Sequence, residues 1–342
     1  MTARLRVVAL AVALLLSLAP NVARAREAAA VETTSRVVDS AVRHLPFAAG
    51  HVALYWVGHP DARVRVAFGK GRLVDAGRDE LGAQRNDGRT YGAVLLAHGA
   101  KTLRIVSNER IGALTVLALP GEPLRRIHDL VNPKPAPGQH VARPAIVSRA
   151  DWGADESLRF KNGKESWPPA FAPTHKLIVH HTAGANSDPN PASTIRAIYR
   201  YHTLSQGWGD IGYNFLIDQQ GRIYKGRNSH APGSDADTIT GQNAAGDGVT
   251  GAQAHGYNTG SVGVALLGTL TNQDATPAAK RALEDLLAWE ADLHDIDPHG
   301  AASGYPNIAG HRDVGDTQCP GGAFYATLPQ VRDAVAARIA AA

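Results

Sequence analysis

The chain has 342 residues, of which 44% are hydrophobic and 19% are charged. This length and balance suit a globular protein of two ordinary domains and exclude a chain that is disordered throughout. The formal charge of +4 includes Arg4, Arg6 and Arg24 of an expected leader, so removal of that leader leaves 4 − 3, or about +1. The rest contains no basic run with interleaved aromatic residues, and nucleic acid is therefore not an expected partner.

The first 25 residues have the pattern of an export signal. Arg4 and Arg6 precede an apolar stretch at 7–19, and Ala23-Arg24-Ala25 offers the small residues that a signal peptidase prefers. A membrane anchor is the alternative, but this stretch is shorter than the roughly 20 residues of a membrane-spanning helix. We expect a mature monomer without a transmembrane anchor, exported to a periplasm or to the cell exterior.

Residues 26–131 contain short alternating stretches such as "HVALYWVG", "ARVRVAF" and "KTLRIVS", separated by glycine, aspartate and asparagine. This pattern predicts a small β-rich domain, whose role the sequence does not indicate. Prolines 133, 135, 137 and 144 then mark a stiff linker at 132–145. A second domain is expected over 146–342.

Strands and helices alternate in this second domain. A strand is predicted at 176–181, and a helix follows from Pro191 with Asn190 as its cap. "GYNFLID" and "GRIYKGR" predict a hairpin, and the apolar run "SVGVALLG" predicts a strand buried on both faces. Two more helices are expected, from Pro277 and from about Pro329. The predicted fold class is α/β, with a mixed central sheet flanked by helices.

His180 and His181 end the first of these strands. Adjacent side chains of a strand point to opposite faces, so only one of the two can enter a given small site. His180 shares its face with Ile178, and His181 shares the other with Val179. The pattern alone does not choose between them, and a histidine with a structural hydrogen bond is an equal alternative for either.

Cys319 is the only cysteine, so it cannot form a disulfide within the chain. Seven residues separate it from His311, and the glycines and proline around them favour a loop. A loop can bring a thiolate and an imidazole onto one ion. Catalytic zinc typically takes three protein ligands, so a strand histidine with His311 and Cys319 would complete a set. A buried inert thiol is the alternative for Cys319.

Five ordered stretches carry a resemblance: "IVHHTAG", "GWGDIGYNFLID", "GRIYKGR", "HGYNTGSVGVALLGT" and "GHRDVGDTQCPG". Together they resemble the type 2 N-acetylmuramoyl-L-alanine amidases and the related peptidoglycan recognition proteins. "VSRADWGAD" at 147–155 is similar to the start of the bacterial members. The resemblance covers about 145–340 and nothing in the N-terminal domain.

Carried over by position, the resemblance implies His180, His311 and Cys319 as Zn²⁺ ligands. It also implies Tyr213 as the catalytic tyrosine and Thr317 as a polar residue that orients water or the intermediate. His181 is then expected beside the site, where it would orient a ligand, and His202 is expected in the core. Gln253 stands where many bacterial relatives have histidine, and Lys225 stands where glutamate is commoner, which we interpret as a surface change.

Three polar residues are candidate contacts of a muropeptide. Asn214 and Asn258 carry amides that pair well with peptide groups, although turn and strand roles explain them almost as well. Arg227 is a candidate partner of a stem-peptide carboxylate, with a solvated salt bridge as the equal alternative.

The resemblance implies hydrolysis of the peptidoglycan amide between the lactyl group of N-acetylmuramic acid and the L-alanine of the stem peptide, and therefore an association with the cell wall. Zinc would activate water and polarise the carbonyl, and Tyr213 would donate a hydrogen bond to the developing oxyanion. Two alternatives remain: a peptidoglycan-binding module without catalysis, and a zinc peptidase that cuts elsewhere in the stem peptide. Retention of Cys319 and Tyr213 favours the amidase.

Overall fold

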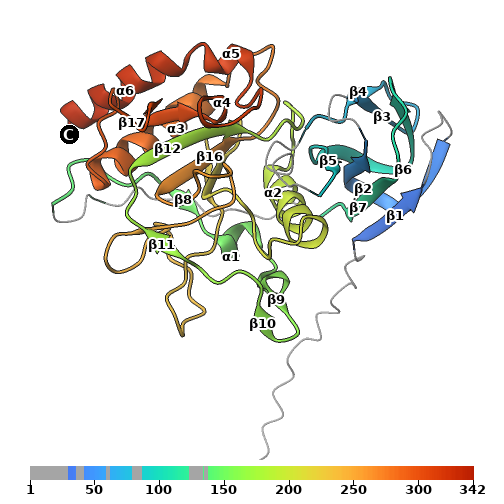
Figure 1. Cartoon of the computed structure of the whole chain (residues 1–342), viewed down its shortest axis with the longest axis horizontal. Coiled ribbons are helices and arrows are strands. Elements are labelled where there is room, and N and C mark those ends of the chain that lie inside the picture. The colour runs from blue at the N-terminus through green and yellow to red at the C-terminus, as the bar shows by residue number, and fades with distance from the viewer. Residues whose placement is uncertain (1–29, 36–41, 59–61, 79–86, 123–133, 135–137) are drawn as a thin grey trace, which may run out of the picture.

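The computed structural model describes residues 30–35, 42–58, 62–78, 87–122, 134 and 138–342. The predicted leader and part of the predicted linker, residues 132, 133 and 135–137, lie outside these ranges, so the leader and the domain boundaries stay predictions. Figure 1 shows a β-domain, drawn in blue to cyan, beside a larger domain of strands and helices. Within the described residues, no helix is both long enough and apolar enough to cross a membrane.

The N-terminal domain is one antiparallel sheet, as the alternating stretches predict. Its strands lie in the order β1-β7-β2-β6-β3-β4, and β5 pairs with β2. The bounds are β1 Val31–Ser35, β2 Val42–Val57, β3 Val64–Phe68, β4 Val74–Asp75, β5 Arg89–Tyr91, β6 Leu95–Ser107 and β7 Leu114–Pro120. One face of the sheet buries an apolar core that includes Val52, Leu54, Val66, Ile105 and Val116.

The second domain is built on a mixed six-stranded sheet in the order β19-β12-β16-β13-β14-β8. β12 pairs in parallel with β16 and β19, β16 in parallel with β13, and β13 and β14 form the predicted antiparallel hairpin. The bounds are β8 Ile146–Val147, β12 Lys176–His181, β13 Phe215–Ile217, β14 Ile223–Lys225, β16 Ser261–Leu266 and β19 Ile308–Gly310. β16 is central and buried along its length, as its apolar run predicts.

Helices cover both faces of this sheet, which confirms the predicted fold class. α2 (Pro191–Arg200) packs on the face that carries Leu216 and Ala265. α3 (Pro277–Leu293) and α6 (Leu328–Ala340) pack on the opposite face with Val179 and Val264. The side chain of Asn190 accepts a hydrogen bond from the Ser193 N–H, so it caps α2 as predicted.

The remaining elements are short and lie in the connections. They are α1 Arg149–Trp152, a 3₁₀ turn at Glu156–Arg159, a π turn at Tyr201–Ser205, α4 His311–Val314, α5 Gly322–Tyr325 and the strands β9 Phe160–Lys161, β10 Lys164–Glu165, β11 Phe171–Ala172, β15 Gly248–Val249, β17 Ala301–Ala302 and β18 Tyr305–Pro306. α4 opens the segment after His311, for which the sequence favours a loop throughout.

The two domains pack directly against each other through α2 and the π turn. Tyr91, Leu117 and Leu119 of the N-terminal domain share one apolar cluster with residues of α2. Glu122, beyond β7, forms ion pairs with Arg196 and Arg200. The Tyr201 hydroxyl donates to the Leu54 carbonyl at 2.9 Å. A buried apolar contact reinforced by ion pairs therefore holds the domains together.

Candidate active site

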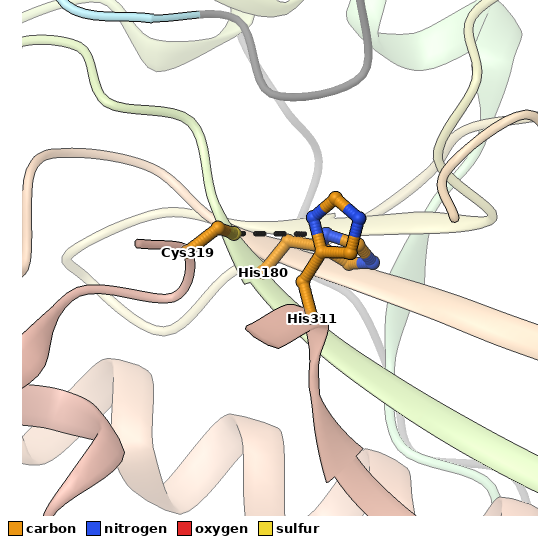
Figure 2. Close-up of side chains that lie close together, drawn as sticks. All are labelled: His180, His311 and Cys319. Carbon is orange, nitrogen blue, oxygen red and sulfur yellow. Dashed lines mark hydrogen bonds between the residues drawn. The ribbon is translucent and has the colours of Figure 1, made fainter. Parts of the chain in front are cut away.

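His180, His311 and Cys319 converge at the edge of the central sheet, as Figure 2 shows. Their ligating atoms all lie within 4.8 Å of one another, and all three side chains are buried. Cys319 Sγ is 3.7 Å from His180 Nδ1. Two such ligands of a tetrahedral zinc ion are about 3.6 Å apart, given bond lengths of about 2.1 Å to nitrogen and 2.3 Å to sulfur. The donor set and its spacing therefore fit one metal ion.

Strand pairing brings these residues together from distant parts of the chain. His180 lies near the carboxyl end of β12, and β19 pairs in parallel with that strand so that Gly310 lies opposite Val179. His311 follows at once as the first residue of α4. The loop after α4 returns because the Arg312 N–H donates to the Cys319 carbonyl at 2.9 Å. The His181 N–H then donates to Cys319 Sγ at 3.3 Å, which stabilises a thiolate.

A chain of hydrogen bonds orients the His180 ring. The Ser261 hydroxyl donates to the Tyr257 carbonyl, so its oxygen is the acceptor for the amide nitrogen of Gln253 at 2.8 Å. The Gln253 oxygen therefore faces His180 Nε2, at 2.6 Å, and accepts a hydrogen bond from its N–H. Nδ1 is left with its lone pair directed toward Cys319, so Nδ1 is the atom that could ligate a metal ion.

Gln253 can reach His180 because residue 263, in the middle of β16, is glycine. A Cβ atom at Gly263 would lie 2.3 Å from Gln253 Cγ, so any larger residue there would displace the amide. The sequence shows Gln253 as a departure from histidine in relatives but gives no sign of this role. The contact joins residues 73 positions apart, and only the folded structure shows it.

Burial, followed by the neighbouring His311, holds the pKa of His180 well below its usual value. The imidazole is therefore neutral, as a metal ligand must be. His181 points to the other face of β12, where its Nδ1 accepts the Leu270 N–H at 3.1 Å. Burial and then Arg312 lower the pKa of His181 to about 4. The alternation of side chains along the strand thus separates the two histidines as expected.

Tyr213 lies against the cluster, just before β13. Its ring centroid is 5.5 Å from that of His180, and its side chain is buried. His202 packs on the Tyr213 ring at 5.8 Å, is buried, and accepts the Gly212 N–H at 3.1 Å through Nδ1. His202 is thus a core histidine, as predicted, and it supports the position of Tyr213.

Thr317 lies in the loop that carries Cys319 and is half-buried. Its Oγ1 accepts the Cys319 N–H at 2.9 Å, a turn that fixes the backbone of the cysteine. The hydroxyl proton of Thr317 is not used in this contact. Thr317 therefore holds the loop and keeps a donor beside the cluster.

Comparison with known proteins identifies the family. A family model described as N-acetylmuramoyl-L-alanine amidase matches residues 170–322. Peptidoglycan-recognition protein LB of Drosophila melanogaster is 33% identical over 194 residues, which cover 56% of this chain and 70% of that protein. The chain belongs to this family of amidases and peptidoglycan-recognition proteins.

Other members of the family are similar over the same domain. The N-acetylmuramoyl-L-alanine amidase of Homo sapiens is 34% identical over 192 residues, which cover 54% of this chain but 28% of the human protein. The solved structure of Drosophila PGRP-LB has 30% identity and a TM-score of 0.40, and the match covers 54% of this chain and 91% of that one.

Two of the predicted substrate contacts are corrected by the structure. Arg227 has no exposed surface: it pairs with Asp210 at 2.9 Å, donates to the Trp167 carbonyl at 2.7 Å and stacks on the Trp167 ring. Asn214 is also buried, and its amide donates to the Val249 carbonyl while its oxygen accepts the Gly263 N–H. Both side chains are committed to the fold, so neither can contact a substrate.

Asn258 is half-buried, and its oxygen accepts the N–H groups of Gln253 and Ala254 at 2.7 and 2.8 Å. It thus fixes the turn that presents Gln253, and its contact with substrate stays a prediction.

Lys225 is fully buried and donates to the Arg227 carbonyl, so its interpretation as a surface change is wrong. Burial, the largest cause, lowers the pKa of Lys225 to about 8.

Proposed function

We propose that this chain is a zinc-dependent N-acetylmuramoyl-L-alanine amidase, which hydrolyses the lactyl amide between N-acetylmuramic acid and L-alanine of peptidoglycan. The observation that carries the proposal is the convergence of His180, His311 and Cys319 beside Tyr213. A buried set of two imidazoles and one thiol suits zinc, and three protein ligands leave a coordination position for chemistry.

His180 and His311 would hold the ion as neutral imidazoles, and Cys319 as a thiolate. When bound, zinc supplies Lewis-acid chemistry that polarises an amide carbonyl and makes water a better nucleophile near neutral pH. By accepting a hydrogen bond from Nε2 of His180, Gln253 would leave the Nδ1 lone pair available to the ion. The His181 N–H would stabilise the negative charge of the Cys319 thiolate.

Tyr213 would donate its hydroxyl proton in a hydrogen bond to the substrate carbonyl oxygen, where negative charge develops during attack. Its buried ring beside His180 supports this role, because a donor held in place needs no reorganisation as the charge grows. Thr317, whose oxygen already accepts the Cys319 N–H, would donate a hydrogen bond to the attacking water and so orient it.

The proposed substrate explains the expected location, because peptidoglycan lies outside the cytoplasmic membrane. The leader pattern at 1–25 supports export to a periplasm or to the cell exterior. A binding module without catalysis is the second candidate, favoured by relatives that are named peptidoglycan-recognition proteins. Cys319 within reach of both histidines favours the enzyme, since binding alone needs no metal ligand set.

Mass spectrometry of defined muropeptides incubated with the zinc-loaded mature protein tests the proposal. We expect free stem peptides that begin with L-alanine, together with sugars that carry a bare lactyl carboxylate. The variant Cys319→Ser, which keeps the size of the side chain, should bind zinc poorly and release neither product. Muropeptides that bind but stay intact would establish the binding module, and products cut within the stem would establish a peptidase.

A further inference from the structure

The N-terminal domain also contacts the loop that leaves β12 (Figure 1). Gly77 follows β4 with a φ of +65°, and a Cβ atom at this position would lie 3.1 Å from the Ala183 carbonyl oxygen and 3.0 Å from Ala93 Cβ. A Cβ atom at Gly184, the next residue of the loop, would lie 3.3 Å from the Val94 carbonyl oxygen. The two backbones therefore approach so closely that a larger residue at Gly77 would have to push them apart.

The loop depends on such contacts because its backbone is strained. Ala183 has a φ of +54°, in the left-handed region that residues with a Cβ atom rarely adopt. A strained conformation persists only where the surrounding structure holds it. Around Ala183 this support comes from Gly77 on one side and from the Thr269 hydroxyl on the other, which donates to the Gly184 carbonyl at 2.8 Å. The conformation of residues 182–184 is thus set by both domains.

Residues 268–271, which lie just after β16, join this loop to the metal-ligand cluster. The Leu270 N–H donates to His181 Nδ1 at 3.1 Å, and the His181 N–H donates to Cys319 Sγ at 3.3 Å. Gly321, two residues after Cys319, packs so closely on Leu270 that a Cβ atom there would lie 2.3 Å from the Leu270 carbonyl carbon. A shift of residues 268–271 would therefore move the surroundings of Cys319.

We propose that the N-terminal domain positions the candidate metal ligands of the second domain, by holding residues 182–184 and, through them, residues 268–271. Networks of packed residues and hydrogen bonds carry energetic coupling between separate sites. A site whose ligands are held in place beforehand loses less conformational freedom when the metal binds, and so binds it more tightly. This gives the N-terminal domain a function that the sequence does not indicate. The inference rests on the proposed function for the zinc ion, whereas the contact between the domains is independent of it.

Gly77→Ala tests this role, because it adds a Cβ atom against the Ala183 carbonyl. Gly69→Ala is the matched control: Gly69 also lies in the N-terminal domain, with a φ of +55°, but a Cβ atom there would meet nothing within 4 Å. Both variants place alanine in the left-handed region, so they share the cost of that conformation. Competition with a chromophoric chelator would measure the zinc affinity of each full-length chain without turnover.

Hydrogen exchange of the metal-free chain provides a second measurement, because it reports the opening of individual hydrogen bonds. The Gly268 and Leu270 N–H groups both bond to side chains at the end of β12. These two amides should exchange faster in Gly77→Ala than in the unsubstituted chain or in Gly69→Ala.

We expect Gly77→Ala to bind zinc about tenfold more weakly than the unsubstituted chain, at the low end of the effect of losing a partner that orients a ligand. Gly69→Ala should change the affinity by less than about twofold. Equal zinc affinities of the two variants would overturn the proposal, as would unchanged exchange of the two amides. A loss of stability in Gly77→Ala with zinc affinity intact would also overturn it, because the contact would then serve folding alone.

If Gly77→Ala does not fold, Val94→Ala takes its place. This milder change trims one side chain from the apolar cluster that also contains Leu267, next to Gly268. The same weaker zinc binding and faster exchange are expected, and the same results would overturn the proposal. Failure of the proposed function shows separately, as intact muropeptides after incubation with protein that has zinc bound.

Discussion

Gln253 decides which nitrogen of His180 can bind a metal. Its amide is held by Ser261 so that the oxygen, an obligate acceptor, faces Nε2 of the imidazole. If this contact is lost, the ring can rotate or take the other tautomer, and both changes weaken a metal bond at Nδ1. Gln253 is therefore a positioning residue, although it is fully buried and has no direct contact with the ion site beyond His180.

Gln253→Ala should lower zinc affinity by about 10- to 100-fold, the usual effect of removing a partner that orients a ligand. Competition with a chromophoric chelator would measure the affinity independently of turnover. Gln220→Ala, at an exposed position of the β13–β14 turn, is the control and should match the parent. If Gln253→Ala bound zinc as tightly as the parent, the orienting role would be wrong.

Tyr213→Phe removes one hydroxyl and keeps the ring that packs on His180 and His202. Zinc binding and folding should be unchanged, whereas kcat should fall by about 10²- to 10³-fold, as for loss of an oxyanion donor. Steady-state hydrolysis of a muropeptide, with metal content measured on the same sample, provides both readings. An unchanged kcat would remove Tyr213 from the mechanism.

We expect Arg227 to contribute to stability and not to substrate binding, because its side chain is buried. Arg227→Met leaves the buried Asp210 with Arg149 as its remaining ion-pair partner, at 3.0 Å, and should cost about 3 kcal/mol of unfolding free energy. Lys280→Met, which removes a partly exposed ion pair with Asp274, should cost less than about 1 kcal/mol. Urea unfolding would measure both. A large rise in KM with stability intact would instead restore Arg227 as a substrate contact.

At the scale of elements, local pattern predicted the parts of the site that depend on periodicity. The strand 176–181, the helix from Pro191 and the hairpin all form, because alternation, a capping residue and turn residues act over a few positions. The choice of His180 over His181 came from the resemblance. So did the choice of His311 and Cys319 as the other two candidate metal ligands. The burial of Asn214 and Arg227 escaped prediction, because their partners Gly263 and Asp210 lie 49 and 17 positions away in sequence.

The contact between α2 and the N-terminal domain contains a titratable group. His51 Nε2 lies 2.8 Å from Thr194 Oγ1, and burial, followed by Arg196 and His98, lowers the pKa of His51 to about 4. An unfolded histidine has a pKa of about 6.5. Between these values the unfolded chain binds the extra proton, so the contribution of His51 to stability is present above about pH 6.5 and is lost as the pH falls toward 4.

His51→Gln should reduce this acid sensitivity. From pH 7 to pH 5, the parent should lose about 2 kcal/mol more unfolding free energy than the variant, at about 1.4 kcal/mol per pH unit below 6.5. Urea unfolding of both proteins at the two pH values gives the loss of unfolding free energy in each. The contributions of titratable groups that both proteins contain cancel when the two losses are subtracted. Identical losses would show that His51 is protonated in the folded protein or does not stay buried.

At the scale of the whole molecule, the two domains act as one unit. The apolar cluster under α2 is completed by Tyr91, Leu117 and Leu119 from the N-terminal domain, and Glu122 adds ion pairs to the same helix. One face of α2 covers the sheet that carries His180, and another meets the N-terminal domain. The family model matches residues 170–322, so the N-terminal domain lies outside that match.

The most direct test of the central claim is a zinc titration of activity. The mature protein would be stripped with a chelator, freed of the chelator, and assayed for release of stem peptides as zinc is added and the bound metal is measured. The account predicts no release without metal and a linear rise that saturates at about one zinc per chain, with no rise in Cys319→Ser. Full release by metal-free protein, or none with one zinc bound, would contradict it.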